Sequence, residues 1–125
     1  MLGGVEWIIE VEGCASTSLA GTGGLSTLRG LFADLIERLD LHPVGEPVWH
    51  LFDEPGGVTG LVALSESHLA CHSYPEAGYL SLNLYTCRAR SMPDWQALLE
   101  QHLGECEAHV RTVQRGPRAA TESAS

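Results

Sequence analysis

Lysine is absent from this 125-residue sequence, and all seven of its basic residues are arginine. Because 16 residues are acidic, the formal net charge is −9 at pH 7, which argues against a nucleic-acid or anionic-membrane partner. No apolar run approaches the length of a transmembrane helix, and the N-terminus lacks the basic and apolar regions of a signal peptide. We therefore expect a cytoplasmic protein.

Paired CxxC motifs are also absent, although the chain has four cysteines. In a cytoplasmic protein these thiols are expected to be reduced. Cys106 with His109 and Cys71 with His72 could each supply two metal ligands, but without paired motifs we predict no metal site. We expect Cys14, Cys71 and Cys106 to have structural roles.

The length and the composition, 44% apolar and 18% charged, are typical of one soluble globular domain. We assign this domain to residues 1–115. Residues 116–125 are small, polar and contain proline, so we expect a disordered C-terminal tail.

Hydrophobic periodicity predicts the order of the elements. Alternating apolar residues indicate a strand at residues 5–12, and the Gly-, Ser- and Thr-rich residues 13–24 are expected to form a loop. Apolar residues at helical spacing predict a helix over residues 26–41, capped by Ser26 or Thr27. A strand at 44–52, which Pro47 places at a sheet edge, is followed by a turn at 53–57 and strands at 58–64 and 78–87. The last predicted elements are a helix capped at Ser91 and a strand at 107–114. The buried residues of that helix are expected to be Trp95, Leu98, Leu99 and Leu103.

This order predicts an α+β fold, a two-layer sandwich in which a mainly antiparallel sheet carries two helices on one face. The other face of the sheet would then need cover. A second copy of the chain is the simplest cover, so we expect a homodimer.

Residues 65–76, between two predicted strands, contain three side chains that can attack or move protons: Ser67, Cys71 and His72. A serine followed five residues later by a histidine can place a hydroxyl near a base. On spacing alone, an ordinary polar strand end is the commoner explanation.

Several ordered segments together resemble the prokaryotic S-adenosylmethionine decarboxylase family over roughly residues 5–115. They are Glu66-Ser67-His68-Leu69 with His72, Tyr74-Pro75-Glu76-x-Gly78-Tyr79, Tyr85-Thr86-Cys87, Phe52, Gly57-Val58-Thr59-Gly60, Glu10 and Gly13-Cys14. The resemblance implies a self-cleaving decarboxylase that acts on S-adenosylmethionine and supplies the aminopropyl donor for spermidine synthesis.

The resemblance also implies roles for individual residues. Cleavage between Glu66 and Ser67 would convert Ser67 into a pyruvoyl group, which takes the substrate amine as a Schiff base. His72 would be the base in processing, and the Thr59 hydroxyl would bind the oxyanion. Cys87 would return a proton to the substrate α-carbon. Pyridoxal phosphate, the common alternative, needs a lysine anchor that this chain lacks.

On the substrate side, Phe52 would stack on the adenine. Glu10 and Glu12 could bind a ribose hydroxyl or the sulfonium, but equally the distal cation of ornithine or arginine. A pyruvoyl-dependent ornithine or arginine decarboxylase on the same scaffold is therefore one alternative. An uncleaved relative that regulates a partner is another.

The sequence departs from the family pattern at four places. Thr59 replaces a serine, Asn83 replaces an acid, Arg88 replaces a glycine, and Val11-Glu12 stands where a larger apolar residue and a tyrosine are common. The family also implies a homodimer whose sites contain residues of both protomers, with Thr59 and Phe52 near the partner's Ser67. The processing residues match the family better than the substrate-binding residues do.

Overall fold

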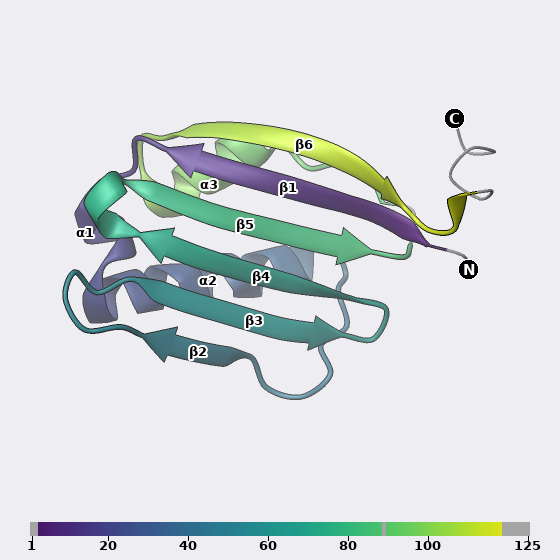
Figure 1. The fold of residues 1–125 in the computed structure, drawn as a ribbon, viewed down its shortest axis with the longest axis horizontal. Coiled ribbons are helices and arrows are strands. Elements are labelled where there is room, and N and C mark those ends of the chain that lie inside the picture. Colours follow the sequence, from purple (N-terminus) through teal and green to yellow (C-terminus); the bar gives the residue numbers. More distant parts are fainter. Residues whose placement is uncertain (1–2, 89, 119–125) are drawn as a thin grey trace.

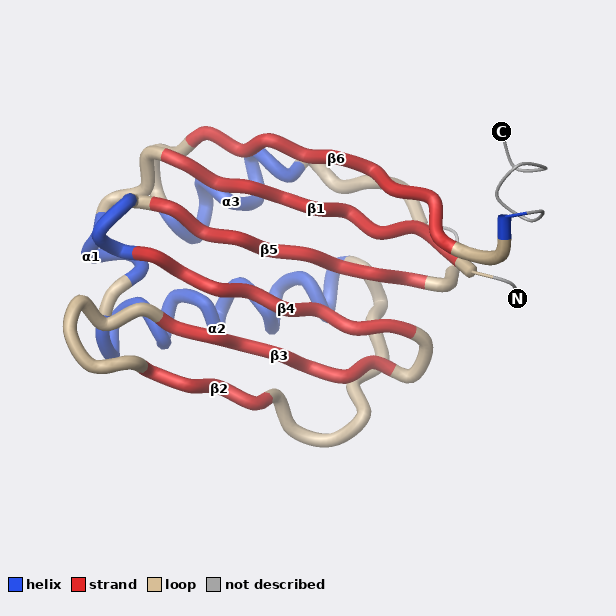
Figure 2. The backbone as a smooth tube through the Cα atoms, viewed as in Figure 1, coloured by secondary structure: helices blue, strands red, loops and turns tan. Residues whose placement is uncertain are grey.

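The computed structural model describes residues 3–88 and 90–118 as one antiparallel sheet backed by helices. The six strands lie in the order β2-β3-β4-β5-β1-β6, and Figures 1 and 2 show the helices behind one face of the sheet. This confirms the predicted α+β sandwich. None of the described helices is long and apolar enough to cross a membrane. The elements are β1 (Gly4–Glu12), α1 (Ser16–Leu19), α2 (Gly21–Arg38), β2 (Val48–Leu51), β3 (Val58–Leu64), β4 (Ser67–Tyr74), the 3-10 helix η1 (Pro75–Ala77), β5 (Tyr79–Thr86), α3 (Trp95–Leu103) and β6 (Glu107–Arg115).

The core lies between the sheet and the helices. Alternate residues of β1 and β5 are buried, because successive side chains of a strand point to opposite faces. They pack against the apolar faces of α2 and α3, and Trp7 contacts Trp95 edge-on at 6.0 Å between ring centroids. The main core side chains are Trp7, Ile9, Val11, Leu28, Leu31, Phe32, Leu35, Leu80, Leu82, Leu84, Leu98 and Leu99.

Most of the predicted loop at residues 13–24 is wrong, because α1 occupies Ser16–Leu19 and α2 begins at Gly21. Gly24 explains the difference: a Cβ there would lie 2.2 Å from the backbone carbon of Leu19, so only glycine lets the two helices meet this closely. The predicted cap at Ser26 or Thr27 is also wrong. The N-cap of α2 is Ala20, which makes no side-chain cap bond.

Other boundaries differ by a few residues. Helix α2 ends at Arg38 rather than at residue 41, and α3 is capped by Asp94, whose carboxylate accepts a 3.1 Å bond from the Ala97 amide, rather than by Ser91. The strand after Pro47 is shorter than predicted but does lie at a sheet edge. Residues 119–125, most of the predicted tail, lie outside the described residues.

Most of residues 65–76 form a strand, β4, rather than a segment between strands. Leu69, Cys71 and Ser73 point into the core, while His72 and Tyr74 are exposed on the other face. That other face, called the open face from here on, is the side of the sheet without helices in Figure 1. Its exposed apolar side chains include Val48, Phe52, Leu61, Tyr74 and Val113. Cover by a second copy remains a prediction.

Candidate active site

Ser67 and His72 do not meet within one chain. Five residues along a strand span about 16 Å, and an odd spacing turns the two side chains to opposite faces. The pairing agrees with this: Ser67 lies opposite the buried Leu64, and His72 lies opposite Thr59. The predicted site residues therefore divide between the two ends of the sheet.

At the His72 end, the Thr59 hydroxyl lies 3.1 Å from His72 Nδ1. The contact follows from the register of β3 and β4, because directly opposed side chains of antiparallel strands are neighbours. Beneath it, the buried Ser73 hydroxyl accepts a 2.8 Å bond from the Val58 amide and donates a 3.1 Å bond to the Leu19 carbonyl. Hydrogen bonds of the neighbouring Ser73 therefore hold the part of the sheet that carries Thr59 and His72.

Phe52, Thr59 and His72 line a pocket of about 500 Å³. This volume lies in the range of small-molecule sites. Phe52 is 52% exposed, and its ring meets the His50 ring edge-on at 4.4 Å between centroids. The ring of Phe52 is therefore available for stacking.

A second pocket of about 650 Å³ adjoins the first, since Tyr74 and Glu76 line both. Glu10 and Glu12 contribute carboxylates to it, and the rings of Tyr74 and Tyr79 stack with 5.6 Å between centroids. Carboxylates and aromatic faces both attract cations. Tyr74 and Glu76 belonged to the quoted family segments, but their sequence pattern indicated no role.

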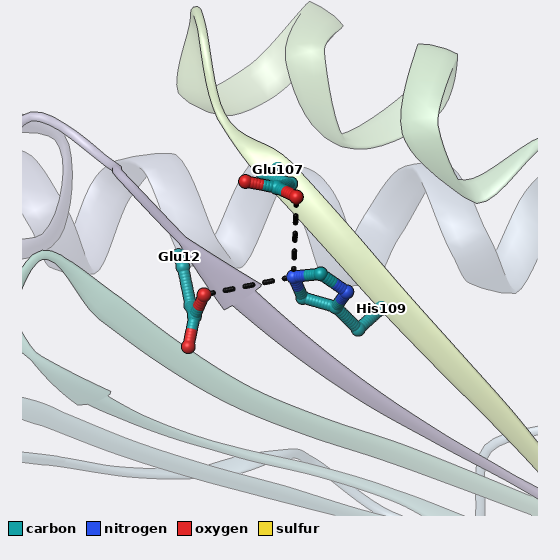
Figure 3. Close-up of side chains that lie close together, drawn as sticks. All are labelled: Glu12, Glu107 and His109. Carbon is teal, nitrogen blue, oxygen red and sulfur yellow. Dashed lines mark ion pairs between the residues drawn. The ribbon is translucent and has the colours of Figure 1, made fainter.

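The two predicted substrate acids already contact basic residues of β6. His109 Nε2 lies 3.5 Å from carboxylate oxygens of both Glu12 and Glu107 (Figure 3), and Arg111 lies 3.8 Å from Glu10. Glu12, Glu107 and His109 are the only group of three metal-ligating side chains among the described residues. All three are exposed, as in ordinary surface ion pairs.

At the other end of the sheet, Ser67 begins β4 directly after a two-residue turn, Ser65-Glu66. One carboxylate oxygen of Glu66 accepts a 2.8 Å bond from Arg88 Nε. The other oxygen, Oε2, is buried and has no hydrogen-bond partner within the described part of the chain. In the sequence, Arg88 was identified only as a departure from the family pattern. In the structure it contacts Glu66, the residue before Ser67.

Cys87 follows β5 at the same end, beside Tyr85. The pKa of Tyr85 is raised, first by a hydrogen bond to the Cys87 sulfur and then by burial. The Arg115 guanidinium lies 4.9 Å from the centroid of the Tyr85 ring and also pairs with Glu6. Sequence reasoning missed this cluster because Glu6 and Arg115 are 109 positions apart and meet only through strand pairing.

An acidic residue lies beside Asn83, although Asn83 itself is neutral. Its amide donates a 3.0 Å bond to Glu6 Oε2 and lies 3.4 Å from His68 Nε2. Glu6 therefore supplies a carboxylate next to the position where the sequence predicted a lost charge.

Two other thiols, those of Cys71 and Cys14, are buried in the core. Burial raises the pKa of Cys71 to about 12 and the pKa of Cys14 to about 11. Because the thiolate is the reactive form, both groups are poor nucleophiles at neutral pH. This agrees with the structural roles expected for them.

Comparisons with known proteins bear on this site. The family model for S-adenosylmethionine decarboxylase matches residues 5–116. An S-adenosylmethionine decarboxylase proenzyme of Pyrococcus horikoshii is 32% identical over 115 residues, covering 90% of this chain and 78% of that protein. A proenzyme of the same description from Prochlorococcus marinus is 42% identical over 78 residues, which cover 62% of each chain.

A solved structure also resembles the fold. The adenosylmethionine decarboxylase of Aquifex aeolicus superposes with a TM-score of 0.73, covering 93% of this chain and 92% of that one, at 20% identity. This likeness supports the sandwich architecture. Since the family model spans nearly the whole described domain, the chain belongs to the S-adenosylmethionine decarboxylase family.

Proposed function

We propose that the protein is a self-cleaving, pyruvoyl-dependent S-adenosylmethionine decarboxylase that acts in the cytoplasm as a homodimer and supplies the aminopropyl donor for spermidine synthesis. Each site would combine Ser67 and Cys87 of one protomer with Thr59 and His72 of the other. The observation that carries this arrangement is the separation of these residues to opposite ends of the sheet. Family membership favours this activity over that of an ornithine or arginine decarboxylase or an uncleaved regulatory relative.

The open face supports the proposed dimer. If two such faces stack about a two-fold axis that lies between them and runs across the strands, each His72 end covers the partner's turn at Ser65-Glu66. Ser67 lies at the rim of the sheet on the side of the buried Leu64, so its side chain would have to turn toward the open face to reach the partner's imidazole. Such an interface is isologous, so both sites form at once. It would also bury Val48, Leu61 and Tyr74, which are exposed apolar side chains in the single chain.

The residues around Ser67 fit formation of a pyruvoyl group. Glu66 and Ser67 lie at a tight turn, and the register that opposes His68 to Tyr85 brings Cys87 alongside Glu66. Among the described residues, Oε2 of Glu66 is buried without a hydrogen-bond partner, so it is a polar group that a second protomer could satisfy.

Self-cleavage would begin when Ser67 Oγ bonds to the Glu66 carbonyl carbon and the peptide C–N bond breaks, with the hydroxyl proton passing to nitrogen. Loss of the Ser67 α-proton then expels the Glu66 carboxylate. Water replaces the nitrogen, which leaves as ammonia, and residue 67 ends as a ketone. The partner's His72 would move the protons, and its Thr59 hydroxyl would donate to the oxyanion.

In turnover, the pyruvoyl group supplies an electron-withdrawing carbonyl that stabilises the charge left on the substrate α-carbon. Cys87 delivers a proton to that carbon. Phe52 stacks on the adenine from the first pocket, and the acidic second pocket attracts the sulfonium. No step of this scheme requires a metal.

Complementation tests the shared site. Ser67→Ala and His72→Ala chains, expressed separately, should each remain full length. In a mixed dimer, one site combines Ser67 of the His72→Ala chain with His72 of the other chain, so the His72→Ala chain should be cleaved. Absence of cleavage in mixed dimers, with cleavage of the wild type, would contradict the shared site.

The substrate has its own test. The cleaved protein should release carbon dioxide from S-adenosylmethionine and not from ornithine or arginine. Methylthioadenosine, which carries the adenine and ribose, should compete for the Phe52 pocket. Carbon dioxide release from ornithine that the nucleoside does not inhibit would favour the alternative substrate.

A further inference from the structure

We propose that Arg88 is a positioning residue for self-cleavage. Its guanidinium holds the Glu66 carboxylate and thereby orients the Glu66 carbonyl toward the Ser67 hydroxyl. The inference rests on the proposed function only in taking the peptide bond between Glu66 and Ser67 as the one that breaks. Arg88 would touch neither the substrate nor the reacting atoms.

The turn that carries this bond needs anchors from outside. Two-residue hairpin loops favour turn types with positive φ, usually built from glycine or asparagine. Ser65 and Glu66 are neither, and Asp40 is the only described non-glycine residue with a positive φ. Two external contacts hold the turn instead: the Ser65 amide donates a 2.8 Å bond to the His42 carbonyl, and Glu66 accepts the 2.8 Å bond from Arg88.

Arg88 is itself held in place, which a positioning residue requires. Its backbone amide donates a 3.2 Å bond to the hydroxyl of Thr86, a side chain that is 1% exposed. Arg90 Nε donates a 3.2 Å bond to the same oxygen, and its Nη1 donates a 2.7 Å bond to the Leu39 carbonyl after α2. The segment that carries Arg88 is therefore tied to both the sheet and the helix layer.

The Glu66 carboxylate has few hydrogen-bond partners besides Arg88 among the described residues. Its side chain is 24% exposed, and Oε2 is buried without a partner among the described residues. A partly buried carboxylate that loses its cation is expected to turn toward water, because burial without a partner is costly. Without this anchor the turn would hold the Glu66 carbonyl carbon less firmly beside Ser67 Oγ, and the C–N bond would break more slowly.

The test is the rate at which purified proenzyme yields the fragments 1–66 and 67–125. Arg88→Gln should slow cleavage about tenfold, the factor that corresponds to about 1.4 kcal/mol of lost orientation. Arg88→Lys keeps the charge and should recover part of the rate. Arg38→Gln is the matched control, because Arg38 Nε bonds Asp34 at 2.7 Å with similar exposure, 49% and 21% against 46% and 24%, on the helix layer.

A double-mutant cycle separates positioning from a general loss of structure. In a Glu66→Gln background, Arg88→Gln should slow cleavage little further, because the charged pair is already gone. Melting curves of Ser67→Ala should shift no more with Arg88→Gln than with the control Arg38→Gln, because the two ion pairs have similar exposure. Equal cleavage rates for wild type and Arg88→Gln, or additive effects in the cycle, would overturn this inference alone. An uncleaved wild type would instead overturn the proposed function.

Discussion

Replacing Thr59 by valine tests what the 3.1 Å contact with His72 does. Valine keeps the branched shape and removes the hydroxyl, so packing changes little while the bond is lost. If the hydroxyl only orients the imidazole, the loss is that of one exposed neutral hydrogen bond, about 1 kcal/mol or a factor of about five in rate. If it binds the oxyanion, as we propose, cleavage should slow by about 10²–10³-fold.

Cleavage can be followed as disappearance of the full-length chain on a denaturing gel. Thr59→Ser keeps the hydroxyl on the same strand position and should cleave at nearly the wild-type rate. Thermal stability of Thr59→Val should fall by less than about 1 kcal/mol, because the contact is exposed. Cleavage of Thr59→Val at the wild-type rate would refute the role of this hydroxyl, and a loss of only about fivefold would reduce it to orienting His72.

Three further predictions concern other parts of the molecule. Cys87→Ala should still cleave but lose about 10²–10⁴-fold in carbon dioxide release, as expected for a missing proton donor; unchanged turnover would remove Cys87 from the mechanism. Gly24→Ala should lower the melting temperature because its Cβ would meet the α1 backbone at 2.2 Å, whereas Gly30→Ala, with nothing within 4 Å, should raise it through helix propensity; equal shifts would contradict the close helix contact. The hydrogen bond with His102 lowers the pKa of Asp34 below its ordinary value of 3.8, so its stabilisation is present above that pH and is lost as the pH falls through the lower folded value. Asp34→Asn should therefore destabilise at pH 7 and have little effect in strong acid, and melting curves with equal differences at both pH values would contradict this.

The fold class could be predicted because the spacing of apolar residues in the sequence indicates which face of each helix or strand is buried. Alternation in β1 and helical spacing in α2 and α3 each indicate one apolar face, and such faces must pack together. The prediction of secondary structure was wrong for two stretches, for different reasons. Residues 13–24 have a loop-like composition, yet Gly24 lets them form packed helices. In β4, polar residues such as His72 and Ser73 conceal a strand in which Leu69, Cys71 and Ser73 are buried.

The sequence by itself determined five of the six strands that the structure describes, the two longer helices, the family and the residue types for the chemistry. Only the tertiary structure decided which of those residues meet. Strand register places Thr59 beside His72, separates His72 from Ser67, and brings Glu6 to Arg115 and Asn83. The physical reason is that a local pattern reports which face a side chain takes, whereas contacts across strands depend on hydrogen-bond pairing between segments far apart in the chain.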